Sequence, residues 1–121
     1  MPPTKLRVKL RGIVKKYHAK SGVYTLQPEL VNGYPTWKQN TSKNSVWFDI
    51  SIGRWTIGWT DCLGSDTGGG IFGPEEEYDW PQNLSGWQYD DGSPTDWIDA
   101  GSDVVIEDYS DGKSETHSNY A

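Results

Sequence analysis

The chain has almost no cysteine, since its 121 residues include only Cys62. A single thiol cannot form an internal disulfide, which excludes a disulfide-stapled scaffold and a cysteine zinc site. Long apolar runs are missing as well. No segment is long enough to span a bilayer, and the first residues lack the apolar stretch of a signal peptide. These absences predict an intracellular, cytoplasmic protein that does not insert into membranes.

The sequence also lacks the pattern of a long helix, because no apolar period of 3.6 residues persists for ten residues. In its place 14 glycines and 7 prolines indicate many turns. Hydrophobic residues make up only 34% of the chain, but 7 Trp, 7 Tyr and 2 Phe supply much of its apolar surface. We therefore predict an all-β domain of about six to eight short antiparallel strands, arranged as a barrel or a sandwich.

Alternating side chains locate several of these strands. Residues 5–11 alternate basic and apolar side chains, and residues 54–59 alternate polar and apolar ones. Asn32-Gly33 is a typical hairpin turn. The domain is expected over residues 1–107, followed by a disordered polar tail over 108–121. The residues that we expect to find in the core are Leu6, Val8, Leu10, Val46, Phe48, Ile50, Trp55, Ile57, Trp59 and Val105.

Charge is unevenly distributed along the chain. The net charge of −6 combines a basic segment, residues 1–28, with an acidic remainder that holds all 17 acids. A basic segment can bind nucleic acid, but no recognition helix or RNA-binding signature accompanies this one. Its alternation instead suggests an edge strand whose charged face deters aggregation. We predict no nucleic-acid partner.

Asp66-Thr67-Gly68 has the sequence of an aspartic-protease catalytic loop. A dimeric protease would need two such carboxylates about 3 Å apart, held rigidly by apolar strands. Here Gly64 and Ser65 precede the triplet, and consecutive glycines follow it. A hairpin turn is the favoured interpretation, and an aspartic-protease-like enzyme remains a distant alternative.

Other catalytic or metal-binding sets have weaker support. Cys62 could pair with His18 or His117, but both histidines lie in polar segments that we expect to be loop or tail. Acidic residues gather in 75–79 and at Asp90-Asp91, yet their spacing matches no calcium-binding loop. We predict no catalytic residues, no metal and no cofactor.

Several of these segments together resemble a known family. In order they are Gly22-Val23-Tyr24, Val31-Asn32-Gly33-Tyr34-Pro35, Arg54-Trp55-Thr56-Ile57-Gly58, Gly69-Gly70-Ile71, Trp87-Gln88-Tyr89 and Trp97. The series is similar to a small β-module found in many proteins of protists and algae, with the pattern G-x-Y, then N-G-x-P-x-[YW], then W-x-I-G. The resemblance covers about residues 5–107. It implies an accessory or interaction domain without catalytic residues.

We therefore expect a non-catalytic interaction module. Its most plausible partner is a protein, which could present a basic surface to the acidic loops 60–66 and 74–83. Trp80 lies between Asp79 and Pro81 and is expected to be exposed, and Trp47 points away from its apolar neighbours. A glycan-binding module is the alternative, because exposed tryptophans can stack on sugars. The predicted binding residues are Trp47, Asp66, Glu75, Glu76, Glu77, Tyr78, Asp79 and Trp80.

Overall fold

The computed structural model describes residues 2–64, 69–76, 79–90 and 97–110. These ranges contain nine strands and four short 3₁₀ segments, and no helix among them is long and apolar enough to cross a membrane. The 3₁₀ segments are η1 (Gly12–Lys20), η2 (Thr60–Cys62), η3 (Pro81–Asn83) and η4 (Gly101–Asp103). The strands are β1 (Lys5–Leu10), β2 (Gly22–Leu26), β3 (Trp37–Gln39), β4 (Asn44–Asp49), β5 (Arg54–Trp59), β6 (Gly69–Glu75), β7 (Gln88–Asp90), β8 (Trp97–Asp99) and β9 (Val104–Asp108).

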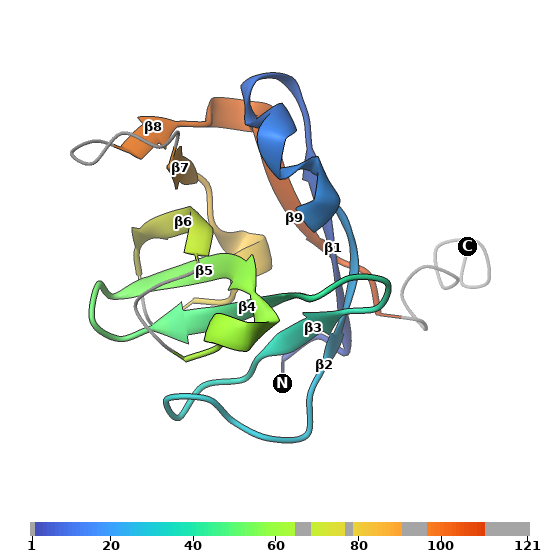
Figure 1. The fold of residues 1–121 in the computed structure, drawn as a ribbon. Helices are drawn as coiled ribbons and strands as arrows, with labels where there is room; N and C mark the ends of the chain where they lie inside the picture. The colour runs from blue at the N-terminus through green and yellow to red at the C-terminus, as the bar shows by residue number, and fades with distance from the viewer. Residues whose placement is uncertain (1, 65–68, 77–78, 91–96, 111–121) are drawn as a thin grey trace, which may run out of the picture.

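All nine strands form one antiparallel sheet in the order β8-β7-β6-β5-β4-β3-β2-β1-β9. The first eight make a meander, and β9 returns to pair with β1. The chain crosses from Asp99 in one edge strand to Val104 in the other within five residue steps, which reach about 19 Å. A flat sheet of nine strands would hold its edges about 38 Å apart. The sheet therefore has to curl, and it forms the half-barrel seen in Figure 1.

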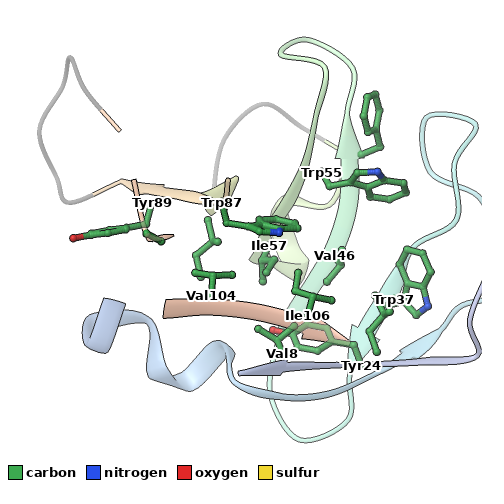
Figure 2. Close-up of a cluster of buried hydrophobic side chains, with 14 residues drawn as sticks. Val8, Tyr24, Trp37, Val46, Trp55, Ile57, Trp87, Tyr89, Val104 and Ile106 are labelled. Atoms are coloured by element: carbon green, nitrogen blue, oxygen red, sulfur yellow. The ribbon is translucent and has the colours of Figure 1, made fainter. Parts of the chain in front are cut away.

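The concave face of the sheet holds the core. Side chains from β1, β4, β5 and β9 meet there, and Figure 2 shows them filling the space that the curled sheet encloses. Three buried tryptophans, Trp37, Trp55 and Trp87, belong to this core, and large rings suit a small core because each removes about 150–250 Å² from water. The buried cluster consists of Leu6, Val8, Tyr24, Trp37, Val46, Phe48, Trp55, Ile57, Ile71, Trp87, Tyr89, Ala100, Val104 and Ile106.

The basic strand β1 is not an edge strand, because β2 and β9 pair with it on both sides. Its charged side chains face outward and are partly neutralised by β9. Arg7 Nη2 and Lys9 Nζ lie 2.7 and 3.2 Å from the Glu107 carboxylate. The hydrogen bond from Arg7 lowers the pKa of Glu107. This ion-pair group links β1 to the strand that closes the sheet.

The all-β prediction is confirmed, but the strand count exceeds the predicted six to eight. The unpredicted strand is β8, whose three residues carry no clear alternation. The predicted hairpin at Asn32-Gly33 is confirmed: both residues have positive φ, and Val31 and Tyr34 exchange two backbone hydrogen bonds.

Three predicted core positions are wrong. Ile50 and Trp59 are 59% and 61% exposed, because β4 ends one residue before Ile50 and Trp59 is the last residue of β5. Val105 is only half-buried, since the neighbouring Val104 and Ile106 are the β9 residues that face the core. Leu10 is also half-buried and packs at the margin of the core.

Candidate functional site

Three loops converge at the end of the sheet where β4 turns back into β5. The turn itself covers residues 49–53, and Gly53 N donates to Asp49 O. On one side, Asn32 Nδ2 from the loop before β3 donates to Phe48 O at 3.1 Å. On the other, Glu75 at the end of β6 forms an ion pair with Arg54, 3.6 Å from carboxylate oxygen to guanidinium nitrogen. The β2–β3 loop, the β4–β5 turn and the end of β6 therefore share one end of the molecule.

This end carries two of the three large hydrophobic side chains that are exposed in the described ranges. Leu30 is 64% exposed and Ile50 is 59% exposed, and the third is Trp59 at the other end of β5. Glu29, the chain neighbour of Leu30, and Glu75, the ion-pair partner of Arg54, are also exposed at this end. We name these four residues, Glu29, Leu30, Ile50 and Glu75, the β4–β5 turn surface. It combines apolar contact area with negative charge.

Hydrogen bonds fix the backbone that presents Ile50. Asp49 is buried, and its Oδ1 accepts bonds from the backbone N and the hydroxyl of Ser51, at 2.9 and 2.6 Å. Such a side-chain-to-backbone contact is typical of aspartate in a turn. Ile50 lies between the two bonded residues, so its side chain points outward from a well-defined turn.

Trp80 is half-buried and packs against the core, whereas the sequence predicted an exposed ring. Its ring centroid lies 6.5 Å from that of Trp55, and Trp55 Nε1 donates to Asp79 O at 2.9 Å. Asp79 Oδ1 in turn accepts from the backbone N of Trp80 and from Asn83 Nδ2. The segment that carries Trp80 thus covers one end of the core. Glu76 is half-buried, and Glu77 and Tyr78 lie outside the described residues.

Trp47 points to the convex face, as its alternation predicts, but it is fully buried and cannot present a contact surface. The chain after β5 runs along this face of β4. Thr60 Oγ1 lies 2.8 Å from Ser45 Oγ, and Gly64 O accepts a 3.4 Å bond from Asn32 Nδ2. Trp47 Nε1 has no hydrogen-bond partner in the described part of the chain.

The residues weighed as catalytic or metal-binding do not come together where they are described. Asp66 and His117 lie outside the described ranges. His18 is exposed in η1, and Cys62 is half-buried in η2. Within these ranges no three His, Cys, Asp or Glu side chains are grouped so that they could hold a metal ion.

A second polar cluster occupies the opposite end of β4 and β5. Lys20, at the end of η1, is only 5% exposed. Its Nζ donates to Asn44 Oδ1 at 2.9 Å and lies 5.7 Å from the ring centroids of both Tyr17 and Trp59. Among the described residues no carboxylate forms an ion pair with it. The cluster therefore holds a buried amine between two aromatic rings.

Burial changes the acid–base properties of two groups in this cluster. It lowers the pKa of the Lys20 ammonium, because a charged amine loses hydration there. Burial also raises the pKa of the Tyr24 hydroxyl, which donates to Lys20 O at 2.6 Å. Both shifts favour neutral groups at this end of the core.

Sequence reasoning missed Leu30, Ile50 and Lys20. Ile50 was assigned to the core because its alternation with Val46 and Phe48 was extended one residue too far. The stretch Asp49-Ile50-Ser51-Ile52-Gly53 does contain a turn pattern that could have corrected it. Lys20 falls within the basic segment 1–28, and no sequence pattern marks it as buried.

No protein-family model, no curated protein and no solved structure matches the chain.

Proposed function

We propose that the protein is a non-catalytic interaction module that binds a protein partner with a basic surface. The observation that carries this proposal is the exposed side chain of Ile50, held outward by the Asp49–Ser51 hydrogen bonds beside exposed acids. The contact area is the β4–β5 turn surface. It lies next to the predicted binding loop 74–83, and Glu75 belongs to both.

Apolar and charged groups have different roles in this interface. Leu30 and Ile50 gain free energy when a partner removes them from water, at about 25 cal/mol per Å² of apolar area. Glu29 and Glu75 attract a basic partner and mainly raise the association rate, an effect that salt weakens. The fixed turn lowers the entropy lost on binding.

The test uses the immobilised chain as bait in extract from its source cells. Proteins captured by the wild-type chain are compared quantitatively with those captured by Ile50→Asp and Glu75→Gln. Thr41→Asp serves as the matched control, because Thr41 is an exposed turn residue at the opposite end of β4. All variants are first checked for an unchanged thermal melt.

We expect a partner that Thr41→Asp captures in the same amount as the wild-type chain. Ile50→Asp should capture at least tenfold less of this partner, and Glu75→Gln should bind it with a slower association rate. A partner retained equally by all three variants would contradict this surface as the interface. Binding to a glycan array that Ile50→Asp leaves unchanged would favour the glycan-binding alternative.

A further inference from the structure

The tight turn of the β2–β3 loop contains an asparagine followed by glycine, Asn32-Gly33. The chain has five asparagines, and Asn32 is the one that precedes a glycine. The backbone nitrogen of the next residue can attack an asparagine side-chain amide, and glycine has no side chain to hinder this approach. Asn32 is therefore the asparagine with the least hindered nucleophile beside it.

The geometry of the turn leaves the attacking nitrogen accessible. Asn32 and Gly33 have φ angles of 57° and 83°, and Asn32 is the one non-glycine residue with positive φ in the described ranges. The two backbone hydrogen bonds of the turn join Val31 and Tyr34, so the Gly33 N–H makes no hydrogen bond with the described residues. Gly33 is exposed, and nothing lies within 4 Å of the position that a β-carbon would take there. The nitrogen is therefore both unbonded and open to water.

The amide of Asn32 is also a structural link. Its Nδ2 donates to Phe48 O at 3.1 Å and to Gly64 O at 3.4 Å. These bonds connect the β2–β3 loop with the end of β4 and with the segment after η2. The second bond is longer than the ordinary range for N–H···O bonds, about 2.7–3.2 Å, and Asn32 itself is exposed. The amide thus joins three segments while it is held by one ordinary and one long bond.

We propose that Asn32 is a self-modifying site whose deamidation releases the β2–β3 loop from β4. The Gly33 nitrogen bonds to Asn32 Cγ, the bond from Cγ to Nδ2 breaks, and ammonia leaves with the proton of the Gly33 N–H. The resulting cyclic imide takes up one water molecule. Opening at one carbonyl gives aspartate and opening at the other gives isoaspartate, so the reaction needs no oxidant or reductant.

Both products remove the structural link. A carboxylate has no hydrogen to donate, so neither product can bond to Phe48 O or Gly64 O. Its negative charge faces two carbonyl oxygens instead. Isoaspartate also adds one atom to the main chain, in a turn whose pairing of Val31 with Tyr34 fixes the register. The modification therefore changes the backbone of the loop as well as its charge.

The modified position lies close in sequence to both apolar residues of the β4–β5 turn surface. Leu30 is two residues before Asn32, and Ile50 is two residues after Phe48, which accepts the Asn32 amide. Releasing the loop should therefore loosen the relative position of Leu30 and Ile50 and weaken partner capture. This consequence rests on the proposed function, whereas the deamidation itself does not.

The test stores the wild-type chain in buffer at pH 8 and follows each asparagine by peptide mass spectrometry, because deamidation changes the mass of the peptide. Asn40 and Asn83 are exposed and precede larger residues, so they serve as internal references. We expect Asn32 to be converted at least tenfold faster than either reference, with isoaspartate among the products. Conversion of Asn32 no faster than that of Asn40 and Asn83 would overturn the proposal.

Two variants test the structural link. Asn32→Asp carries the aspartate product from the start, and Asn40→Asp is its matched control. Asn40 Nδ2 makes no hydrogen bond with the described residues, and its Oδ1, which accepts from Thr25 Oγ1 at 2.6 Å, has an equivalent in aspartate. Asn32→Asp should lower Tm by about 3 °C or more, whereas Asn40→Asp should shift it by less than about 1 °C. Equal shifts for the two variants would contradict the release of the loop.

Partner capture separates this inference from the proposed function. We expect Asn32→Asp to capture at least fivefold less partner than Asn40→Asp from the same extract. Equal capture by the two variants would contradict the link between Asn32 and the β4–β5 turn surface. Absence of any partner that depends on Ile50 would contradict the proposed function, while the rate of deamidation and the two melts would still decide the modification.

Discussion

Trp55 and Trp59 lie on the same face of β5, four residues apart, yet their surroundings differ completely. Trp55 is fully buried and contacts the rings of Trp37, Phe48 and Trp80. Trp59 is the last residue of its strand and is mostly exposed. Alternation predicts the face on which a residue lies, but the depth of burial depends on what covers that face.

Replacing Trp55 by alanine should cost about 3–5 kcal/mol of unfolding free energy, because it leaves a large cavity among the aromatic rings. A loss of that size is enough to unfold a domain of ordinary stability. Trp59→Ala, the matched control on the same strand, should change the unfolding free energy by less than about 1 kcal/mol. Urea unfolding of both variants checks this. Equal losses for the two would contradict the assignment of the core.

The pKa shifts of Lys20 and Tyr24 predict how the unfolding free energy changes with pH in the alkaline range. Burial lowers the pKa of Lys20 in the folded chain below its ordinary 10.5. At pH values between this lowered pKa and 10.5, the unfolded chain therefore binds more protons than the folded chain. The unfolding free energy should therefore rise with pH in that window. The raised pKa of Tyr24 acts in the opposite direction above about pH 10, where only the unfolded chain loses the hydroxyl proton.

Urea unfolding at a series of pH values from neutral to 11 measures this profile. Lys20→Met keeps a side chain of similar length without the amine, so the rising part should disappear in that variant. A wild-type stability that falls steadily from pH 7 would contradict the burial of a charged amine.

At the scale of elements, the strands with clean alternation were predictable. The predicted residues 54–59 match β5, and 5–11 exceeds β1 by one residue. β8 was not predictable, because its three residues Trp97–Asp99 are too few to show a period. Its pairing with β7 alone places it in the sheet, at one edge. Such short strands depend on their neighbours more than on their own sequence.

The candidate site was less predictable than the fold. The composition of residues 74–83 indicates an acidic loop. The partial burial of Trp80, however, depends on its ring contact with Trp55, which lies 25 positions earlier in the sequence. Ile50 is exposed because β4 ends one residue before it, and a strand one residue longer would include it. The position of Trp80 cannot be obtained from local pattern alone, whereas the turn pattern of residues 49–53 does indicate the exposure of Ile50.

The contact between η1 and β6 gives a prediction at this scale. A β-carbon at Gly70 would lie 2.6 Å from Tyr17 Cε1, which is too close for any carbon pair. Gly70→Ala should therefore displace Tyr17 and cost about 1–3 kcal/mol, as overpacking does. Gly33→Ala would not be a matched control, because Gly33 has a positive φ. Ser45→Ala, on β4 of the same sheet, is the better comparison, since its Oγ makes a single described hydrogen bond to Thr60.

Thermal melts of Gly70→Ala and Ser45→Ala check this prediction. A Gly70→Ala chain as stable as wild type would contradict the close packing of η1 on β6.

For the whole molecule, the short connection between β8 and β9 forces the sheet to curl, and the two ends of the paired strands β4 and β5 differ in chemistry. The end around the β4–β5 turn presents exposed apolar side chains and acids. The opposite end holds the buried Lys20 amine close to the rings of Tyr17 and Trp59. One sheet thus carries an exposed surface at one end and a buried polar cluster at the other.

Hydrogen–deuterium exchange of the chain with and without its captured partner tests the proposed interface most directly. We expect slower exchange of backbone amides in residues 27–34 and 49–53 when the partner is bound, with residues 40–43 at the opposite end of β4 unchanged. Protection confined to residues 40–43, or absent from both 27–34 and 49–53, would contradict the assignment of the β4–β5 turn surface.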